Sequence, residues 1–280
     1  MSLLLQAPTI ESLAEVLQPG RMHDPVGRSW WPFNQAARSL HSSLSRGVGG
    51  NVLIFARLAK QLGHEQPVYG LQARGLDGEA PPFTRVEEMA ALYVQEICAV
   101  RPKGPYLIGG TCTGGVVAYE MAQQLVGRGE QVILARSWKP GILAPIRPTA
   151  MITKNCGTCL SVSGLPTGEG KLGSIKNLLK REWFHNSNLE DYTDLVASAT
   201  LCAVSHYHPK PYPGCLLNVI ASTRPLSHST QDTRLAWSEL ALTGDQTVFM
   251  PAEDSGRLFV SPHVQELAHH LVAHFNHESS

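Results

Sequence analysis

The segment Gly109-Gly110-Thr111-Cys112-Thr113-Gly114-Gly115 places one cysteine in a Gly-x-Cys-x-Gly pattern. The apolar run 105–109 before it predicts a short buried strand, and the run 116–126 after it predicts a helix. A strand, a glycine-framed turn and a helix together form a nucleophile elbow, which lifts the central side chain above the sheet. Thiols at helix N-termini ionise more readily than free ones, so we expect Cys112 to be a nucleophile. The alternative is a buried, inert cysteine, which the glycine frame disfavours.

The other cysteines do not suggest a disulfide scaffold in a chain of 280 residues. The pair Cys156 and Cys159 has the spacing of half a zinc site or of a redox pair. Cys202 and Cys215 are too far apart in the chain to supply a matching second pair. We therefore expect no metal site.

Composition excludes several classes of partner. The 23 basic and 23 acidic residues cancel, which leaves no electrostatic signature of a protein that binds nucleic acid or an anionic membrane. The apolar run at residues 3–5 is far too short for a signal peptide, and no window reaches the ~18 apolar residues of a membrane span. We expect a cytoplasmic protein, and a hydrophobic content of 43% is typical of a globular enzyme.

Elements that could position Cys112 alternate along the chain. Thr84 and Glu87 predict a capping box, and Ser261 with Pro262 predicts the start of the last helix. The alternation predicts an α/β fold with a mostly parallel sheet and helices on both faces. The predicted helices are 51–62, 84–100, 116–126, 194–205, 234–240 and 261–275, and the predicted strands are 68–73, 105–109, 131–136, 215–222 and 247–251.

Three segments fall outside this alternation. Residues 3–17 have the apolar spacing of a short amphipathic helix, and residues 18–41 are rich in Pro, Gly, Arg and aromatics, as in a linker. Residues 139–193 read as an irregular insertion. This insertion leaves the sheet at the edge where Cys112 should lie, so we expect it to be a lid.

Four blocks of the sequence closely resemble the terminal thioesterase domains of nonribosomal peptide synthetases and polyketide synthases. These blocks are Gly49–Ala59, Gln66–Gly75, Gly104–Gly110 and Val116–Ala122. The resemblance implies an α/β-hydrolase fold over residues 46–280 with a lid at about 140–205. It also implies a linker at 21–45, and that residues 1–20 are a remnant of the last helix of a preceding carrier protein.

The same resemblance implies a function. Such domains release an acyl or peptidyl chain from a carrier-protein thioester by hydrolysis, cyclisation or transfer. The partners would be a carrier-protein domain and a small-molecule acyl or peptidyl substrate held on its phosphopantetheine arm, with no bound cofactor. Here the intermediate would be acyl-Cys112, a thioester that keeps the acyl group activated and suits transfer to an amine or ring closure.

The sequence departs from the family at the other catalytic positions. No carboxylate occurs in 135–140, where the family has its aspartate, and Ser255 stands where it has histidine. The loop Arg46–Gly50 resembles the family's His-Gly-x-Gly-Gly, so the backbone amides of Val48 and Thr113 are the expected oxyanion hole. The segment 41–45 is too polar for the usual central strand.

Another histidine could act as the base. His228 follows the strand 215–222 at the carboxyl edge and is the tentative candidate, with Asp232 or Asp254 as loose carboxylate partners. His185 lies in the expected lid. We expect two histidines near the opposite edge and five on the surface of the closing helix or tail: His206 and His208, then His263, His269, His270, His274 and His277.

A second hypothesis is a catalytically degenerate domain that keeps only the fold and the carrier-docking surface. The missing histidine and carboxylate and the polar segment 41–45 favour it.

Overall fold

The computed structural model describes residues 30–34, 42–45, 52–63, 66–78, 80–138, 189–222 and 237–278. Its strands form one seven-stranded sheet in the order β1-β3-β2-β4-β5-β6-β7. β1 is antiparallel to β3, and all other neighbouring strands are parallel. The strands are β1 Trp30–Asn34, β2 Ser42–Ser45, β3 Val68–Leu71, β4 Tyr106–Thr111, β5 Val132–Trp138, β6 Leu216–Ala221 and β7 Asp245–Met250.

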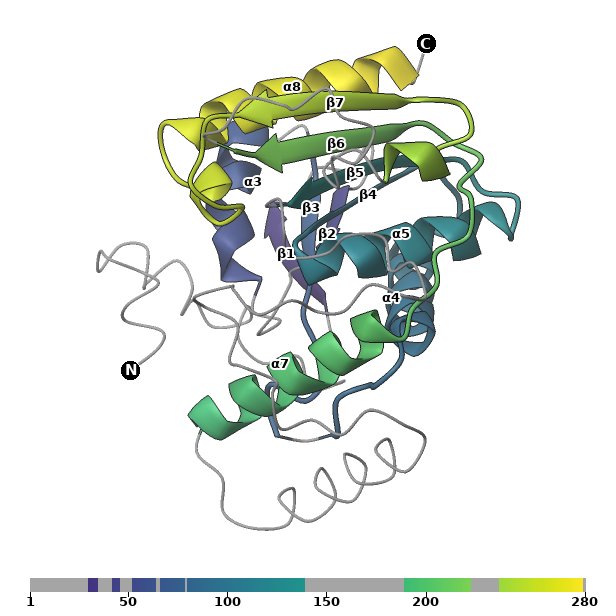
Figure 1. Cartoon of the computed structure of the whole chain (residues 1–280), viewed down its shortest axis with the longest axis vertical. Coiled ribbons are helices and arrows are strands. Elements are labelled where there is room, and N and C mark those ends of the chain that lie inside the picture. Colours follow the sequence, from purple (N-terminus) through teal and green to yellow (C-terminus); the bar gives the residue numbers. More distant parts are fainter. Residues whose placement is uncertain are drawn as a thin grey trace.

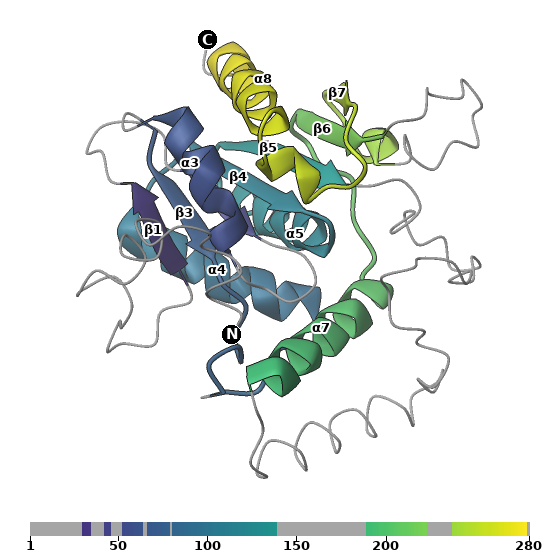
Figure 2. The same cartoon turned by 90° about the vertical axis from the view of Figure 1, so that its left-hand side faces the viewer.

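Helices cover both faces of the sheet (Figures 1 and 2). α4 and α5 enclose one hydrophobic core against the sheet, and α3 and α8 enclose a second on the opposite face. None of the helices in the described ranges is both long and apolar enough to cross a membrane. The α-helices are α3 Ala56–Leu62, α4 Val86–Val100, α5 Thr113–Val126, α7 Leu189–Ser205 and α8 His263–Glu278, and the short 3-10 helices are η1 Leu53–Phe55, η2 Ser238–Leu240 and η3 Arg257–Phe259.

The central strands explain why the sequence predicted a parallel sheet. Every residue of β4 and of β6 is buried. Strands of a parallel sheet are covered on both faces, and their sequences are therefore near-continuous apolar runs. The α/β architecture expected from the alternation of elements is confirmed.

The linker expected at 21–45 is wrong for two segments. β1 forms the edge of the sheet beside β3, and the polar segment Ser42–Ser45 is β2, which lies between β3 and β4. Leu44 supplies the apolar contact: its side chain is buried, and a Cβ on Gly109 of β4 would lie only 2.7 Å from its Cδ2. The backbone pairing on both sides makes this segment a central strand despite its three serines.

Two helix starts differ from the predictions. α4 begins at Val86 with Arg85 as its N-cap and no side-chain cap, so the capping box of Thr84 and Glu87 does not form. α5 begins at Thr113, three residues before the predicted start, because its glycines Gly114 and Gly115 are helical.

α7 is the described part of the expected lid at 140–205. It packs against α4 and α5, and Figure 1 shows it beside these helices. Near its start, the ring of Tyr192 covers Gly78 in the loop after β3, where a Cβ would lie 2.8 Å from the ring. The helices expected at 3–17 and over the first part of 234–240, and the remainder of the lid, lie outside the described residues.

Candidate active site

Cys112 lies in the turn between β4 and α5, as the elbow pattern predicts. Its backbone has φ 55° and ψ −126°, and it is the only non-glycine residue with positive φ in the described ranges. A side chain at positive φ is strained by its own Cβ. This conformation is the one that turns a nucleophile outward from the end of a strand.

Gly110 makes the sharp turn possible. A Cβ on Gly110 would overlap the carbonyl oxygen of Gly114 and lie 2.6 Å from the backbone nitrogen of Gly115. The last residues of β4 therefore approach the first turn of α5 more closely than any residue with a side chain permits. The glycine frame of the sequence pattern has a direct steric reason here.

The first turn of α5 begins directly after the cysteine. The amide of Gly115 donates to the carbonyl of Cys112 (3.1 Å), which closes the turn. Thr113, the first helical residue, is fully buried, whereas Cys112 is half-buried. Helix N-termini carry unpaired N–H groups and a partial positive charge, which favour an anion such as a thiolate.

The site lies at the carboxyl edge of the sheet. Ser45 pairs with both Leu71 of β3 and Gly110 of β4, so these strands end at the same level. The loops that follow β3, β4, β5, β6 and β7 all leave from this edge, because the strands are parallel. Catalytic groups in sheets of this type come from these loops.

The loop after β7 is where the resemblance implied a catalytic histidine. Asp254 uses its carboxylate locally: its Oδ1 accepts from the amides of Gly256 (2.8 Å) and Arg257 (3.0 Å) and holds the turn before η3. Ser255 is half-buried beside it. The loop therefore reaches the correct edge of the sheet but holds no imidazole.

β5 itself offers no carboxylate, and the loop after it lies outside the described residues. β5 runs to Trp138, and none of its residues is Asp or Glu. Four candidates predicted from the sequence lie outside the described residues: Val48, His185, His228 and Asp232. Cys112, Thr113 and Asp254 are thus the candidates that the structure places at this edge.

The described histidines have different environments. His206 and His208 are exposed, and His206 Nδ1 lies 2.8 Å from the carbonyl oxygen of Cys202. His274 was expected on the surface, which is wrong: it is 2% exposed, with Nδ1 3.2 Å from Gln246 Oε1 of β7. His263 is half-buried at the first residue of α8, just after the carboxyl-edge loop, and sequence reasoning grouped it with the surface histidines.

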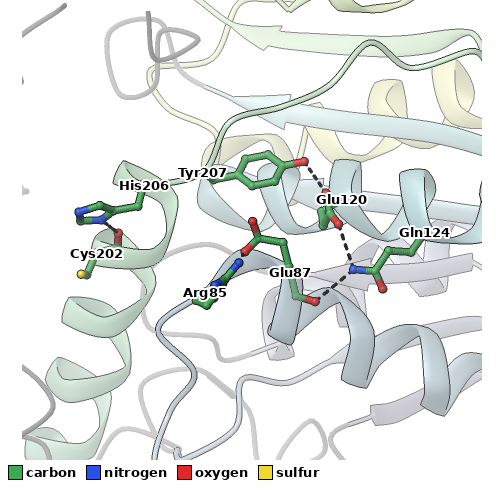
Figure 3. Close-up of polar contacts among 7 residues, drawn as sticks. All are labelled: Arg85, Glu87, Glu120, Gln124, Cys202, His206 and Tyr207. Atoms are coloured by element: carbon green, nitrogen blue, oxygen red, sulfur yellow. Dashed lines mark hydrogen bonds and ion pairs between the residues drawn. The ribbon is translucent and has the colours of Figure 1, made fainter. Parts of the chain in front are cut away.

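A polar network ties α7 to the helix that carries the nucleophile (Figure 3). Tyr207, just after α7, donates to Glu120 Oε2 of α5 at 2.7 Å. Glu120 Oε1 accepts from Gln124 Nε2 at 3.0 Å, and Gln124 in turn donates to the carbonyl of Glu87 in α4 at 3.1 Å. Burial, together with Glu120, raises the pKa of Tyr207. No sequence signal could reveal this contact, because Glu120 and Tyr207 are 87 residues apart.

Comparisons with known proteins agree with this geometry. Residues 46–135 match the family model described as a thioesterase domain. The chain is 41% identical over 137 residues to malpibaldin synthetase of Mortierella alpina, and 45% identical over 133 residues to atromentin synthetase invA5 of Paxillus involutus. These matches cover 47% and 46% of this chain but only 2% and 14% of the relatives' lengths.

A solved structure extends the likeness to most of the chain. The NocB thioesterase domain, solved as a covalent complex with a fluorophosphonate nocardicin G analog, superposes with a TM-score of 0.63. It is 22% identical, and the match covers 88% of this chain and 99% of that one. The expected α/β-hydrolase fold is thereby confirmed.

Proposed function

We propose that this chain is the thioesterase domain of a nonribosomal peptide synthetase or related assembly line, and that it receives an acyl or peptidyl chain on Cys112 from a carrier-protein thioester. The observation that carries the proposal is the elbow. Cys112 has the strained backbone, the glycine contact beneath it and the helix N-terminus beside it that a nucleophile requires. The partial matches to synthetases support the assembly-line setting.

The acylation step exchanges one thioester for another. The Cys112 thiol gives up its proton to the proposed base, His228, and its sulfur attacks the thioester carbonyl. The resulting tetrahedral oxyanion would be held by the amides of Thr113 and Val48. As it collapses, the bond to the carrier's phosphopantetheine sulfur breaks, and that sulfur leaves as a thiol after taking up a proton.

Release then needs a second nucleophile. Water would give hydrolysis, a hydroxyl or amine within the chain would give cyclisation, and an external amine would give transfer. We propose His228 as the base that activates this nucleophile, because it follows β6 in the chain and β6 ends at the same edge of the sheet as Cys112. Among the residues that the structure describes, the alternative base is His263, which is the first residue of α8 and follows the loop after β7.

Incubation with octanoyl-N-acetylcysteamine followed by intact-mass analysis tests the proposal. The parent protein should gain one octanoyl group, and Cys112→Ala should gain none. Cys202→Ala removes a different, buried thiol and should still be acylated. A parent protein that stays unmodified, also with peptidyl and carrier-bound thioesters, would show that Cys112 is not a working nucleophile.

The second candidate is the degenerate domain. The observation in its favour is the loop after β7, where Asp254 caps a turn and Ser255 stands at the position where the resemblance implies a histidine. Under this reading Cys112 could be acylated without being released. Multiple turnovers of a carrier-bound substrate above the rate in buffer exclude it, and their loss in His228→Ala or in His263→Ala identifies the base.

A further inference from the structure

Arg74 is a half-buried cation that contacts an aromatic ring. It lies three residues after β3, and its Cζ is 4.8 Å from the centroid of the Phe83 ring. Within the described residues, no carboxylate lies within ion-pair distance of Arg74. A guanidinium that lies over an aromatic ring is held by cation–π attraction and can still donate N–H groups to another partner.

The loop that carries Arg74 is held from three sides. Tyr93 of α4 donates to the carbonyl of Gln72 at 3.1 Å, just before Arg74. Gly75 has φ +95°, and its Cβ position lies 2.8 Å from the carbonyl oxygen of Ala80, so the chain folds back tightly on itself. Gly78 lies beneath the ring of Tyr192 from α7. The positive charge is therefore held at a defined place.

That place is at the same edge of the sheet as Cys112. β3 and β4 are separated by β2 alone, which puts them about 10 Å apart at the usual strand spacing. Leu71 and Gly110 stand at the same level because both pair with Ser45. Arg74 and Cys112 follow these two residues by three and two positions, so both belong to loops that leave this edge from strands two spacings apart.

We propose that Arg74 binds the phosphate of the carrier's phosphopantetheine arm while the arm's thioester reaches Cys112. The inference rests on the proposed function. The arm carries an acyl thioester at one end and a phosphodiester at the other, so a carboxyl-edge site that receives it needs a cation set apart from the nucleophile. A planar guanidinium donates two parallel hydrogen bonds to phosphate oxygens, which a lysine cannot do.

Calorimetric titration with 4′-phosphopantetheine and with pantetheine isolates the phosphate, because these two probes differ only there. The parent protein should bind the phosphorylated probe about tenfold or more tightly, the effect of one charge-assisted hydrogen bond. Arg74→Gln, which keeps a planar group over Phe83, should remove this preference, and Arg74→Lys should keep only part of it. Arg85→Ala removes a nearby, exposed arginine and should leave the preference intact.

Three outcomes would overturn the assignment: equal binding of the two probes by the parent protein, a preference that survives in Arg74→Gln, or inorganic phosphate binding as tightly as phosphopantetheine. The last would mark a site for free anions. These results are independent of chemistry at Cys112. If no acyl-Cys112 forms while the Arg74-dependent preference is present, the proposed function fails and the phosphate site at Arg74 stands. If Cys112 is acylated but the preference is absent, the proposed function stands and the phosphate site at Arg74 fails.

Discussion

The backbone of Cys112 is strained, and the residue types beside it allow the chain to hold this conformation. A non-glycine residue with such a backbone costs about 1–3 kcal/mol, so it persists only where the surrounding structure enforces it. Gly110 supplies the close contact with α5. Thr111 and Thr113, the residues on either side of the cysteine, are both buried. The site is thus preorganised by local contacts that do not depend on the lid.

Gly110→Ala should destabilise the protein by about 3 kcal/mol or more. Its Cβ would collide with the backbone of Gly114 and Gly115, which cannot move without unwinding the first turn of α5. Denaturant unfolding followed by circular dichroism measures the change. Gly127→Ala is the matched control at the other end of α5, where φ is −61° and the nearest atom is 3.3 Å away. A Gly110→Ala protein as stable as the control would contradict the steric account.

Ser255→His should supply a base at the position where the resemblance to thioesterase domains implies a histidine. We expect hydrolysis of an acyl thioester to rise about tenfold or more, since a positioned general base contributes ~10²–10⁴-fold when fully aligned. The measurement is steady-state release of N-acetylcysteamine, in the parent background and with Cys112→Ser added.

The control for this variant is Glu253→His, which adds a histidine to the same loop at a side chain that is 77% exposed. An equal rate rise in both variants would mean that any nearby imidazole acts from solution. No rise in either variant would show that the loop after β7 does not reach the acylated cysteine.

At the scale of elements, the sequence predicted the parts whose residue types determine their structure. β4 and β6 are apolar runs buried on both faces, and α5 follows from its glycine-framed start. β2 could not be predicted in this way, because Ser42–Ser45 becomes a strand only through pairing with β3 and β4. Local composition cannot reveal a partner that lies 26 residues or more further along the chain.

Tyr207→Phe should loosen α7 without removing the core contact of the ring. The lost hydrogen bond to Glu120 is partly buried and charge-assisted, so the free energy of unfolding should fall by about 1–3 kcal/mol. The substitution should increase the rate of hydrogen exchange at the amides of α7 more than at the amides of β4. Arg85→Ala breaks an exposed ion pair at the far side of the same network and should cost less than about 1 kcal/mol. Unchanged exchange in Tyr207→Phe would show that apolar packing alone holds α7.

In the whole molecule, the part of the candidate site that adjacent residues form was predictable from the sequence. The part that distant segments bring together was not. The Gly110–Gly114 pattern sufficed to place Cys112, because the turn is made by adjacent residues. Arg74 and Ser255 reach the same edge of the sheet only through the order of the strands. The burial of His274 likewise depends on α8 packing over the start of β7, which the amphipathic pattern of the helix does not specify.

Buried tyrosines give the whole fold a predictable response to alkali. Burial raises the pKa of Tyr93, with a smaller contribution from Glu96, and burial together with Glu120 raises the pKa of Tyr207; both pKa values lie above the ordinary 10.0. Below pH 10 both phenols are neutral in the folded and unfolded chains, so their ionisation does not lower the free energy of unfolding. Above pH 10 the unfolded chain loses protons that the folded protein retains, so stability falls as pH rises through the raised values.

Each of these tyrosines should therefore lower the free energy of unfolding by about 1.4 kcal/mol per pH unit above pH 10. Urea unfolding between pH 8 and pH 11.5 measures this slope. The double variant Tyr93→Phe/Tyr207→Phe starts from a lower stability at pH 8, because two hydrogen bonds are lost, yet its stability should decline less steeply above pH 10. Parallel curves for the parent and the double variant would show that these two phenols do not set the alkaline limit of the fold.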